Sequence, residues 1–187
     1  MPAPAAGSSP PSRLSSLELL VLRHAEAERK GVTDFDRALT KEGREDATNA
    51  GRRLGELQLT PDAVFSSPAA RAIVTARLAV AALGPNAPAV QPEPQVYDAS
   101  REILAKVLGA RGGAARRLLL VGHNPGLSDL ASWLCNLPSG WSLGKSATAQ
   151  LRLRATWKDL SKGCGRLIDV HEELGPPARP PKPPEEM

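Results

Sequence analysis

The sequence predicts an α/β protein in which helices cover both faces of a mostly parallel central sheet, a three-layer α/β/α sandwich. Three short apolar runs carry this prediction, over residues 17–22, 62–66 and 117–122. Runs of four to six apolar residues bounded by polar, Gly or Pro residues are typical of buried parallel strands. A segment with helical character follows each run, and this alternation builds such a sandwich.

The helices expected between these strands begin and end at recognisable residues. The first starts after Thr40 and presents Ala and Leu residues on one face at spacings of three and four. The second spans residues 69–83, with Pro68 in front of it and Gly84 behind it. The remaining expected elements are a strand over 91–96, a helix over 100–108 ended by Gly109, a helix over 126–136, and strands over 148–154 and 166–170. Polar and apolar residues alternate in the last two strands, which favours half-exposed, antiparallel strands.

The length and composition fit one globular domain with two tails. The chain has 187 residues, of which 41% are hydrophobic, and this suffices for a single core over residues 16–174. Aromatic residues make up only 3%, so the core must consist mostly of Leu, Val and Ala. Residues 1–15 and 175–187 are rich in Pro and poor in apolar bulk, and we expect disordered tails there.

Charge, hydropathy and cysteine usage give no support to a nucleic-acid or membrane partner. The net charge of +4 is mild, and the Arg residues are not interleaved with aromatic residues, so a nucleic-acid partner has no support. No stretch of 18 apolar residues exists that could span a membrane, and the N-terminal segment does not resemble a secretory signal. Cys135 and Cys164 lie in unlike contexts, as in a reducing compartment. We therefore expect a cytoplasmic protein without nucleic-acid or membrane partners; the sequence does not specify an oligomeric state.

Two of the three histidines directly follow predicted strands. Arg23 and His24 follow the first run, and His123 follows the run that ends at Gly122. Ligands in open α/β sheets bind outside the carboxyl ends of the strands. Arg71 lies near the start of a predicted helix, where a cation opposes the helix dipole and is accepted when an anion must be held. The sequence thus predicts an anion site at this edge of the sheet.

Arg and His side chains in this arrangement suit phosphoryl transfer. The oxygens of a phosphate repel nucleophiles, so catalysis depends on positive charge and N–H donors around the equatorial oxygens. Arg23 and Arg71 supply bidentate forks that stay charged, and His123 can add a donor. The neighbouring Arg charges favour a neutral His24, whose second ring nitrogen needs an orienting partner such as a backbone carbonyl. This chemistry requires neither metal nor other cofactor, and the sequence offers no cluster of metal-ligand residues.

Three motifs, in this order, resemble the signature of the histidine phosphatase superfamily. They are Arg23-His24-Ala25, Ser66-Ser67-Pro68-Ala69-Ala70-Arg71-Ala72 and Val121-Gly122-His123-Asn124-Pro125. The resemblance spans about residues 17–174 and is closest to the SixA-like branch, whose members include phosphohistidine phosphatases. Ala25 in place of Gly, the segment Asp36-Arg37-Ala38-Leu39-Thr40 and the lack of a cap domain are similar to that branch.

The resemblance implies a phosphoglycerate mutase-like fold and a phosphatase that works through a phosphohistidine intermediate. It implies His24 as the phosphoryl acceptor, with Arg23, Arg71 and His123 completing a phosphate pocket that binds the substrate. It also implies a phosphorylated protein or a small phosphorylated molecule as substrate. Two alternatives stay open, a phosphoglycerate mutase-like phosphotransferase and a non-catalytic phosphate- or phosphoprotein-binding module.

The chain departs from the wider superfamily where a glutamate near residue 96 normally protonates the leaving oxygen. The segment Val96-Tyr97-Asp98-Ala99-Ser100 offers only Asp98, which can equally cap a helix. A P–N bond breaks without such an acid once its nitrogen is protonated, so the gap favours phosphohistidine over alkyl esters.

Other polar residues near the motifs are expected to serve structure. Ser66 and Ser67 are expected to cap the helix after Pro68, because no G-x-S-x-G elbow surrounds them. Asn124 is expected to be a turn or cap residue, and His171 a surface or structural residue.

Overall fold

The computed structural model describes residues 16–30 and 33–172; the tails expected over 1–15 and 175–187 lie outside the described residues. Ten helices and strands follow one another in this part of the chain, with two single-turn 3₁₀ helices. In order they are β1 (Leu17–Arg23), α1 (Lys41–Glu56), β2 (Ala63–Ser66), α2 (Ala70–Leu83), β3 (Val90–Pro92), η1 (Pro94–Val96), α3 (Arg101–Arg111), β4 (Arg117–Gly122), α4 (Gly126–Cys135), β5 (Thr148–Leu153), η2 (Trp157–Asp159) and β6 (Gly165–His171).

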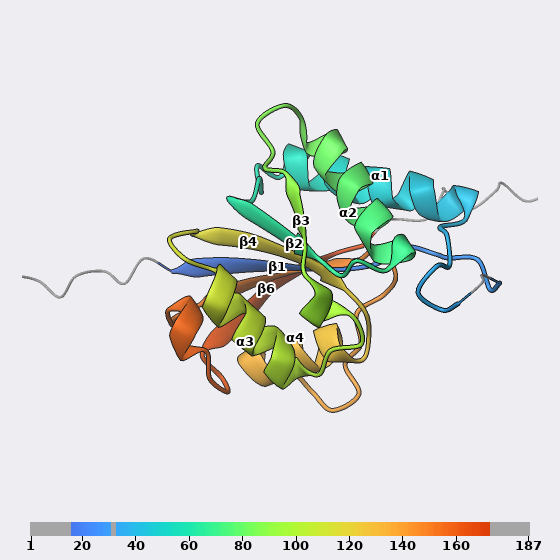
Figure 1. The fold of residues 1–187 in the computed structure, drawn as a ribbon. Helices are drawn as coiled ribbons and strands as arrows, with labels where there is room; N and C mark the ends of the chain where they lie inside the picture. The colour runs from blue at the N-terminus through green and yellow to red at the C-terminus, as the bar shows by residue number, and fades with distance from the viewer. Residues whose placement is uncertain (1–15, 31–32, 173–187) are drawn as a thin grey trace, which may run out of the picture.

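The strands form one mixed sheet in the order β3-β2-β4-β1-β5-β6. The pairs β2–β3, β2–β4 and β1–β4 are parallel, whereas β5 pairs antiparallel with both β1 and β6. Helices α1 and α2 cover one face and α3 and α4 the other (Figure 1). The predicted three-layer sandwich with a mostly parallel sheet is confirmed.

The central strands are apolar on both faces because both faces are covered. Successive side chains of β1 point to opposite sides. Leu20 and Leu22 pack in the cluster beneath α1 and α2, whereas Leu19 and Val21 pack in the cluster that α3 and α4 cover. All four are fully buried. The continuous apolar run therefore follows from burial on two sides.

β3 is shorter than the strand expected over residues 91–96. It spans Val90–Pro92 and pairs with β2 at the edge of the sheet. Proline has no N–H to donate to a strand ladder, so Pro92 and Pro94 end the strand early. The chain turns into η1 instead, and the turn brings Tyr97 next to His123.

α3 continues past Gly109, where the sequence predicted its end. The helix reaches Arg111, and Gly112 caps it. A Cβ atom at Gly109 would lie 3.2 Å from the carbonyl oxygen of Trp157. Gly109 therefore allows η2 to approach the helix closely. The sequence alone does not distinguish a glycine that permits such a contact from one that ends a helix.

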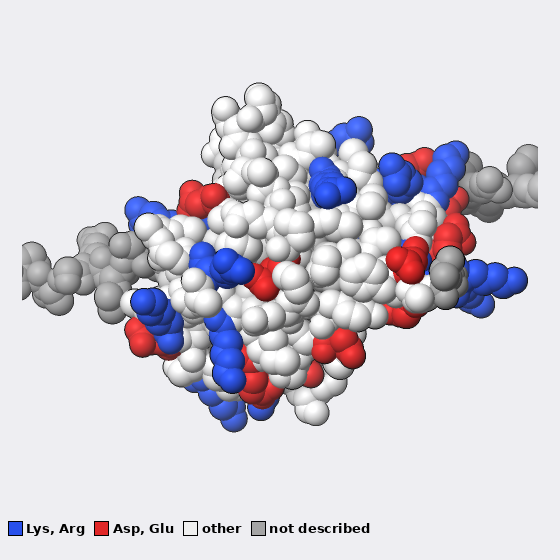
Figure 2. All heavy atoms as spheres, viewed as in Figure 1, with Lys and Arg blue, Asp and Glu red and all other residues white. Residues whose placement is uncertain are grey.

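The surface carries no extended patch of one charge on the face shown in Figure 2. Basic and acidic side chains lie interspersed around a largely uncharged centre there. In the part of the chain that the structure describes, no helix is both long and apolar enough to cross a membrane.

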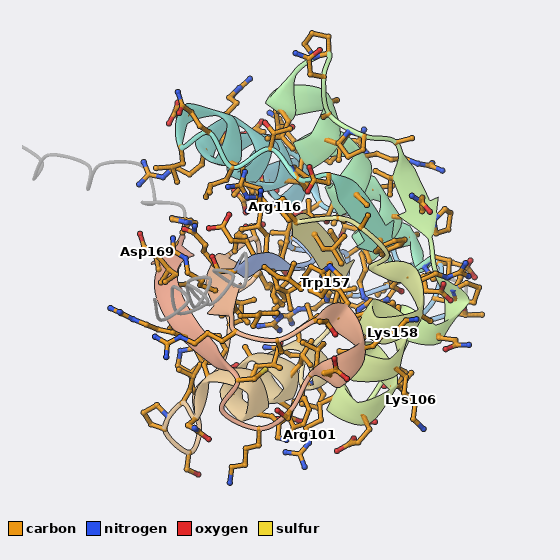
Figure 3. All side chains as sticks on the ribbon, turned by 90° about the vertical axis from the view of Figure 1, so that its left-hand side faces the viewer. Arg101, Lys106, Arg116, Trp157, Lys158 and Asp169 are labelled. Atoms are coloured by element: carbon orange, nitrogen blue, oxygen red, sulfur yellow. The ribbon has the colours of Figure 1, made fainter. Side chains whose placement is uncertain are left out.

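The end of the sheet at which the parallel strands begin is closed by a tryptophan. Trp157 is buried, and its indole N–H donates to the carbonyl of Ala115 at 2.7 Å. Figure 3 looks at this end, with Trp157 directed inward and Lys106 and Lys158 at the periphery. The polar residues that follow β1 and β4 lie at the opposite end, because both strands run in the same direction.

Two glycines of α1 test how closely α1 and α2 pack. A Cβ at Gly51 would lie 2.1 Å from the carbonyl oxygen of Ala79, whereas a Cβ at Gly55 would meet no atom within 4 Å. We expect Gly51→Ala to lower the free energy of unfolding by about 1–3 kcal/mol, because the backbones must separate. Gly55→Ala should raise it by up to about 1 kcal/mol through helix propensity. Urea unfolding measures both, and equal effects would contradict the close packing.

Candidate functional site

Three loops that follow neighbouring strands meet at the carboxyl edge of the sheet. The backbone N–H of His24, after β1, donates to the carbonyl of Gly122, and that of Ser67, after β2, donates to Val121. These bonds continue the strand register beyond the strands and hold the loops together. The ring centroids of His24 and His123 lie 5.1 Å apart, with the rings tilted by 54°.

The hydrogen bond of His24 Nδ1 decides which ring nitrogen is free. Nδ1 lies 2.7 Å from the carbonyl oxygen of Ala25. A carbonyl oxygen can only accept, so Nδ1 carries the proton and Nε2 keeps its lone pair. Ala25 is held in turn, because its N–H donates to Thr75 Oγ1 at 3.1 Å and the Thr75 hydroxyl donates to Arg71 O at 2.6 Å. The expected backbone-carbonyl partner of His24 is confirmed.

Both histidines of the site are neutral near neutral pH. Burial lowers the pKa of His24 to about 4, opposed by its carbonyl bond and aided by the charges of Arg71, Arg23 and Lys145. Burial likewise lowers the pKa of His123 to about 3, with Arg71 as the next cause. From the sequence we expected the Arg charges to keep His24 neutral; in the structure, burial is the larger cause of its lowered pKa.

Arg23 and His123 each carry a buried polar atom without a partner among the described residues. Nη1 of Arg23 donates to the carbonyl of Leu143 at 2.9 Å, but its Nε makes no hydrogen bond. His123 Nε2 lies 2.8 Å from Ser67 Oγ, and its Nδ1 makes none. Buried polar groups rarely stay unpaired, and those that do have a functional or structural reason. In this protein both unpaired atoms belong to the group of residues around the His24–His123 pair.

Arg71 is the most buried cation of the site, with its side chain 8% exposed, and it is held by Asp34. Its Nη1 donates to the carbonyl of Asp34 at 2.5 Å and its Nη2 to the Asp34 carboxylate at 2.9 Å. A guanidinium has five N–H donors. Asp34 therefore orients Arg71 with two of them and leaves three for another acceptor.

Asp34 belongs to the loop between β1 and α1 and is ionised. Its carboxylate accepts hydrogen bonds from Arg37 at 3.0 Å, Arg71 at 2.9 Å and the Tyr97 hydroxyl at 3.2 Å. The Arg37 bond first, and then those from Arg71 and Tyr97, hold the pKa of Asp34 at about 2. No motif in the sequence indicated Asp34, although it lies just before the segment that contains Arg37.

The comparisons with known proteins decide the family. The sequence profile of the histidine phosphatase superfamily (branch 1) matches residues 19–103. An uncharacterized protein of Mycobacterium tuberculosis is 33% identical over 161 residues, which cover 80% of this chain and 98% of that protein. The chain belongs to the histidine phosphatase superfamily.

Solved structures place it in the SixA-like branch of that superfamily. A SixA protein from Nakamurella multipartitia is 26% identical and superimposes with a TM-score of 0.71, over 85% of this chain and 97% of that one. The protein histidine phosphatase SixA complexed with tungstate is 21% identical, with a TM-score of 0.73, over 83% and 97% of the two chains. The phosphoglycerate mutase-like fold is confirmed.

All four site residues inferred from the superfamily motifs lie around one point. The rings of His24 and His123 are adjacent, and the charges of Arg23 and Arg71 act on both imidazoles. Within residues 16–30 and 33–172, no group of three or more His, Cys, Asp or Glu side chains could hold a metal ion. The charge of the site comes from the guanidinium groups of Arg23 and Arg71, which suit an anion.

The expected capping of α2 by Ser66 or Ser67 is wrong. The N-cap residue is Ala69, which has no side-chain capping bond. The Ser66 hydroxyl donates to the carbonyl of Ser67 instead. Ser67 Oγ accepts a long bond of 3.3 Å from the N–H of Ala69 and contacts His123. Ser67 thus orients His123, a contact between loops that no local pattern reveals.

Asn124 fixes the loop after β4 and does not cap α4, whose N-cap residue is Pro125. Its amide donates to the carbonyl of Leu143 at 2.9 Å, and its Oδ1 accepts from the Ser128 hydroxyl at 2.7 Å. The same carbonyl accepts from Arg23. The turn interpretation of Asn124 is therefore right, and the turn also helps to place Arg23.

Asp98 and His171 take no part in the pocket's hydrogen bonds. Ser100, not Asp98, is the N-cap residue of α3, so the capping interpretation is wrong. Asp98 is exposed, has a φ of 49°, and its side chain makes no hydrogen bond or ion pair with the described residues. His171 is buried on β6, with Nε2 3.2 Å from Gln150 Oε1, which confirms a structural role.

Cys135 and Cys164 are free thiols.

The lowered pKa values predict the titration of the site. In histidine-selective NMR titrations, His24 and His123 should stay neutral from pH 8 down to about pH 5. The urea-unfolded chain should titrate near pH 6.5. The unfolded state then binds more protons as pH falls from about 6.5 towards 4, so folding stability decreases through this window. A midpoint near 6.5 for His24 in the folded protein, assigned with a His24→Asn variant, would contradict the buried, neutral imidazole.

Proposed function

We propose that the protein is a phosphatase that hydrolyses phosphohistidine in a protein, or another activated small phosphate, through a phosphohistidine intermediate on His24. One observation carries this proposal. The Nδ1–H of His24 is tied to the Ala25 carbonyl, which leaves a nucleophilic Nε2 lone pair beside two guanidinium groups and a second imidazole. Nucleophile, orienting partner and cationic donors are the parts that covalent phosphoryl transfer needs.

The first step forms the phosphoenzyme. Nε2 of His24 attacks phosphorus in line with the leaving group, while Arg23, Arg71 and His123 stabilise the charge on the three equatorial oxygens. The new N–P bond places positive charge on the His24 ring, and the Ala25 carbonyl stabilises that charge through Nδ1–H.

The second step hydrolyses the phosphoenzyme and regenerates free His24. Water attacks the phosphorus from the side that the leaving group has vacated, the N–P bond breaks with its electron pair returning to Nε2, and inorganic phosphate leaves with both protons of the water. The same cationic donors serve both steps, because both pass through a similar distribution of charge.

The carboxylates next to the pocket support a substrate whose leaving group needs no enzymatic acid. Asp34 is ionised, with a pKa of about 2, and is bound to Arg71, so it has no proton to donate. Asp98 is exposed and makes no side-chain bond to the described residues. An imidazole that is protonated on the ring nitrogen not bonded to phosphorus leaves as a neutral ring without help, whereas an alkoxide needs an acid. A fold neighbour is named a protein histidine phosphatase, which agrees with this substrate class.

The two alternatives account less well for the site. A phosphoglycerate mutase-like transferase must protonate and deprotonate an alkyl oxygen; Asp34 has no proton to donate, and the exposed Asp98 is outside the hydrogen bonds of the site. A module that only binds phosphate has no need of a neutral, tautomerically fixed imidazole at His24.

His24→Ala should abolish turnover and phosphoenzyme formation. Rapid-quench labelling with a ³²P-labelled phosphohistidine protein, in the presence of a metal chelator, should give an acid-labile, base-stable label on the wild-type chain. His171→Asn is the matched control, because His171 bonds only outside the pocket and should leave labelling intact. Label on the His24→Ala chain would refute the nucleophile, and loss of wild-type labelling with chelator would refute metal independence.

Rates should depend on the leaving group. Aryl phosphates should react faster as their phenols become more acidic, and alkyl phosphates should be nearly inert. Asp98→Asn, which tolerates the positive φ, should change kcat only slightly on either class. If Asp98 were the general acid, the substitution would cost roughly 10² to 10⁴ on poorly activated esters and much less on activated ones. That pattern would restore broad ester hydrolysis as the function.

A further inference from the structure

Two aromatic side chains continue the row of rings that begins with the two histidines of the pocket. The ring centroid of Tyr97 lies 5.7 Å from that of His123, at an interplanar angle of 87°. The ring of Phe35 lies 5.1 Å from that of Tyr97, at 77°. The chain has one tyrosine and two phenylalanines, so this is an unusual concentration.

Both rings are linked to Asp34, the residue that orients Arg71: Tyr97 by a hydrogen bond, and Phe35 as the next residue in the chain. The Tyr97 hydroxyl donates to the same carboxylate oxygen of Asp34 that accepts from Arg71. Phe35 directly follows Asp34 in the chain, and its carbonyl accepts from the N–H of Ala70 at the start of α2. The positions of the rings and of the Arg71 guanidinium are therefore set by one network.

The position of the Phe35 ring at the surface is not explained by packing into the core. Phe35 is 37% exposed, in a chain whose described large apolar side chains are mostly buried, and Tyr97 is half-buried. A ring held at the surface by an edge contact keeps much of its face available to another flat group.

We propose that Phe35 and Tyr97 form a leaving-group subsite that selects phosphoryl groups carried on a flat unsaturated ring, above all the imidazole of phosphohistidine. The inference rests on the proposed function and adds the residues that set its substrate class. In-line attack by His24 sends the leaving group out of the pocket, and beyond His123 the next side chains in the row are Tyr97 and Phe35. The imidazolium ring of a phosphohistidine protonated on its other ring nitrogen is attracted to aromatic rings as a cation while the P–N bond is intact, and the neutral imidazole that leaves can still stack on them.

Two small substrates separate this subsite from the phosphate pocket. Phosphoimidazole and phosphoramidate share the P–N bond and the phosphoryl group, but only phosphoimidazole carries a ring. For each variant, the loss of kcat/KM relative to wild type is measured on both substrates, so that the intrinsic reactivity of each substrate cancels. Phe35→Ala and Tyr97→Leu should each lose about 3- to 10-fold more on phosphoimidazole than on phosphoramidate.

Two further variants serve as controls. Tyr97→Phe keeps the ring and removes the bond to Asp34, so any loss should fall equally on both substrates and leave the selectivity unchanged. Ile168→Ala removes an apolar side chain that is also 37% exposed, but on the edge strand β6, and should affect neither substrate.

Equal losses on both substrates for Phe35→Ala and Tyr97→Leu would overturn the subsite and leave the proposed function standing. A selectivity lost in Tyr97→Phe as well would assign the effect to the Asp34 bond and overturn the role of the ring. Wild-type protein inactive on both substrates would overturn the proposed function, and this inference with it.

Discussion

The hydrogen bond from His24 Nδ1 to the Ala25 carbonyl is the interaction on which the site depends. It fixes the tautomer, and burial keeps the ring neutral, so that a lone pair remains on Nε2 amid positive charge. The remaining contacts follow from that requirement. Thr75 holds Ala25 in place, and Ser67 contacts the facing imidazole of His123.

The buried guanidinium of Arg71 also needs a counter-ion that leaves some of its N–H donors available. Asp34 meets this need from a loop, because it neutralises Arg71 while accepting from only two of the five guanidinium N–H groups. Its pKa, lowered to about 2, keeps it charged near neutral pH. The proposed chemistry and the proposed aromatic subsite share this one carboxylate.

The sequence predicted the parts of the site that follow directly from strands. Arg23, His24 and His123 stand one or two residues beyond buried runs, and the carboxyl ends of parallel strands meet at one edge. Asp34 and Tyr97 were not predicted as partners, because they are brought together across 63 residues by two irregular loops. Gly109 was misread for a related reason, since its close contact with η2 depends on a segment far along the chain.

A crystal structure with vanadate, which mimics the phosphoryl group in the transition state, tests the role of His24 as the nucleophile most directly. The account predicts vanadium bonded to Nε2 of His24, with Nδ1 still on the Ala25 carbonyl and the equatorial oxygens accepting from Arg23, Arg71 and His123. Vanadate bound elsewhere, or bonded to another side chain, would contradict it. So would a His24 ring flipped so that Nε2 faces the Ala25 carbonyl.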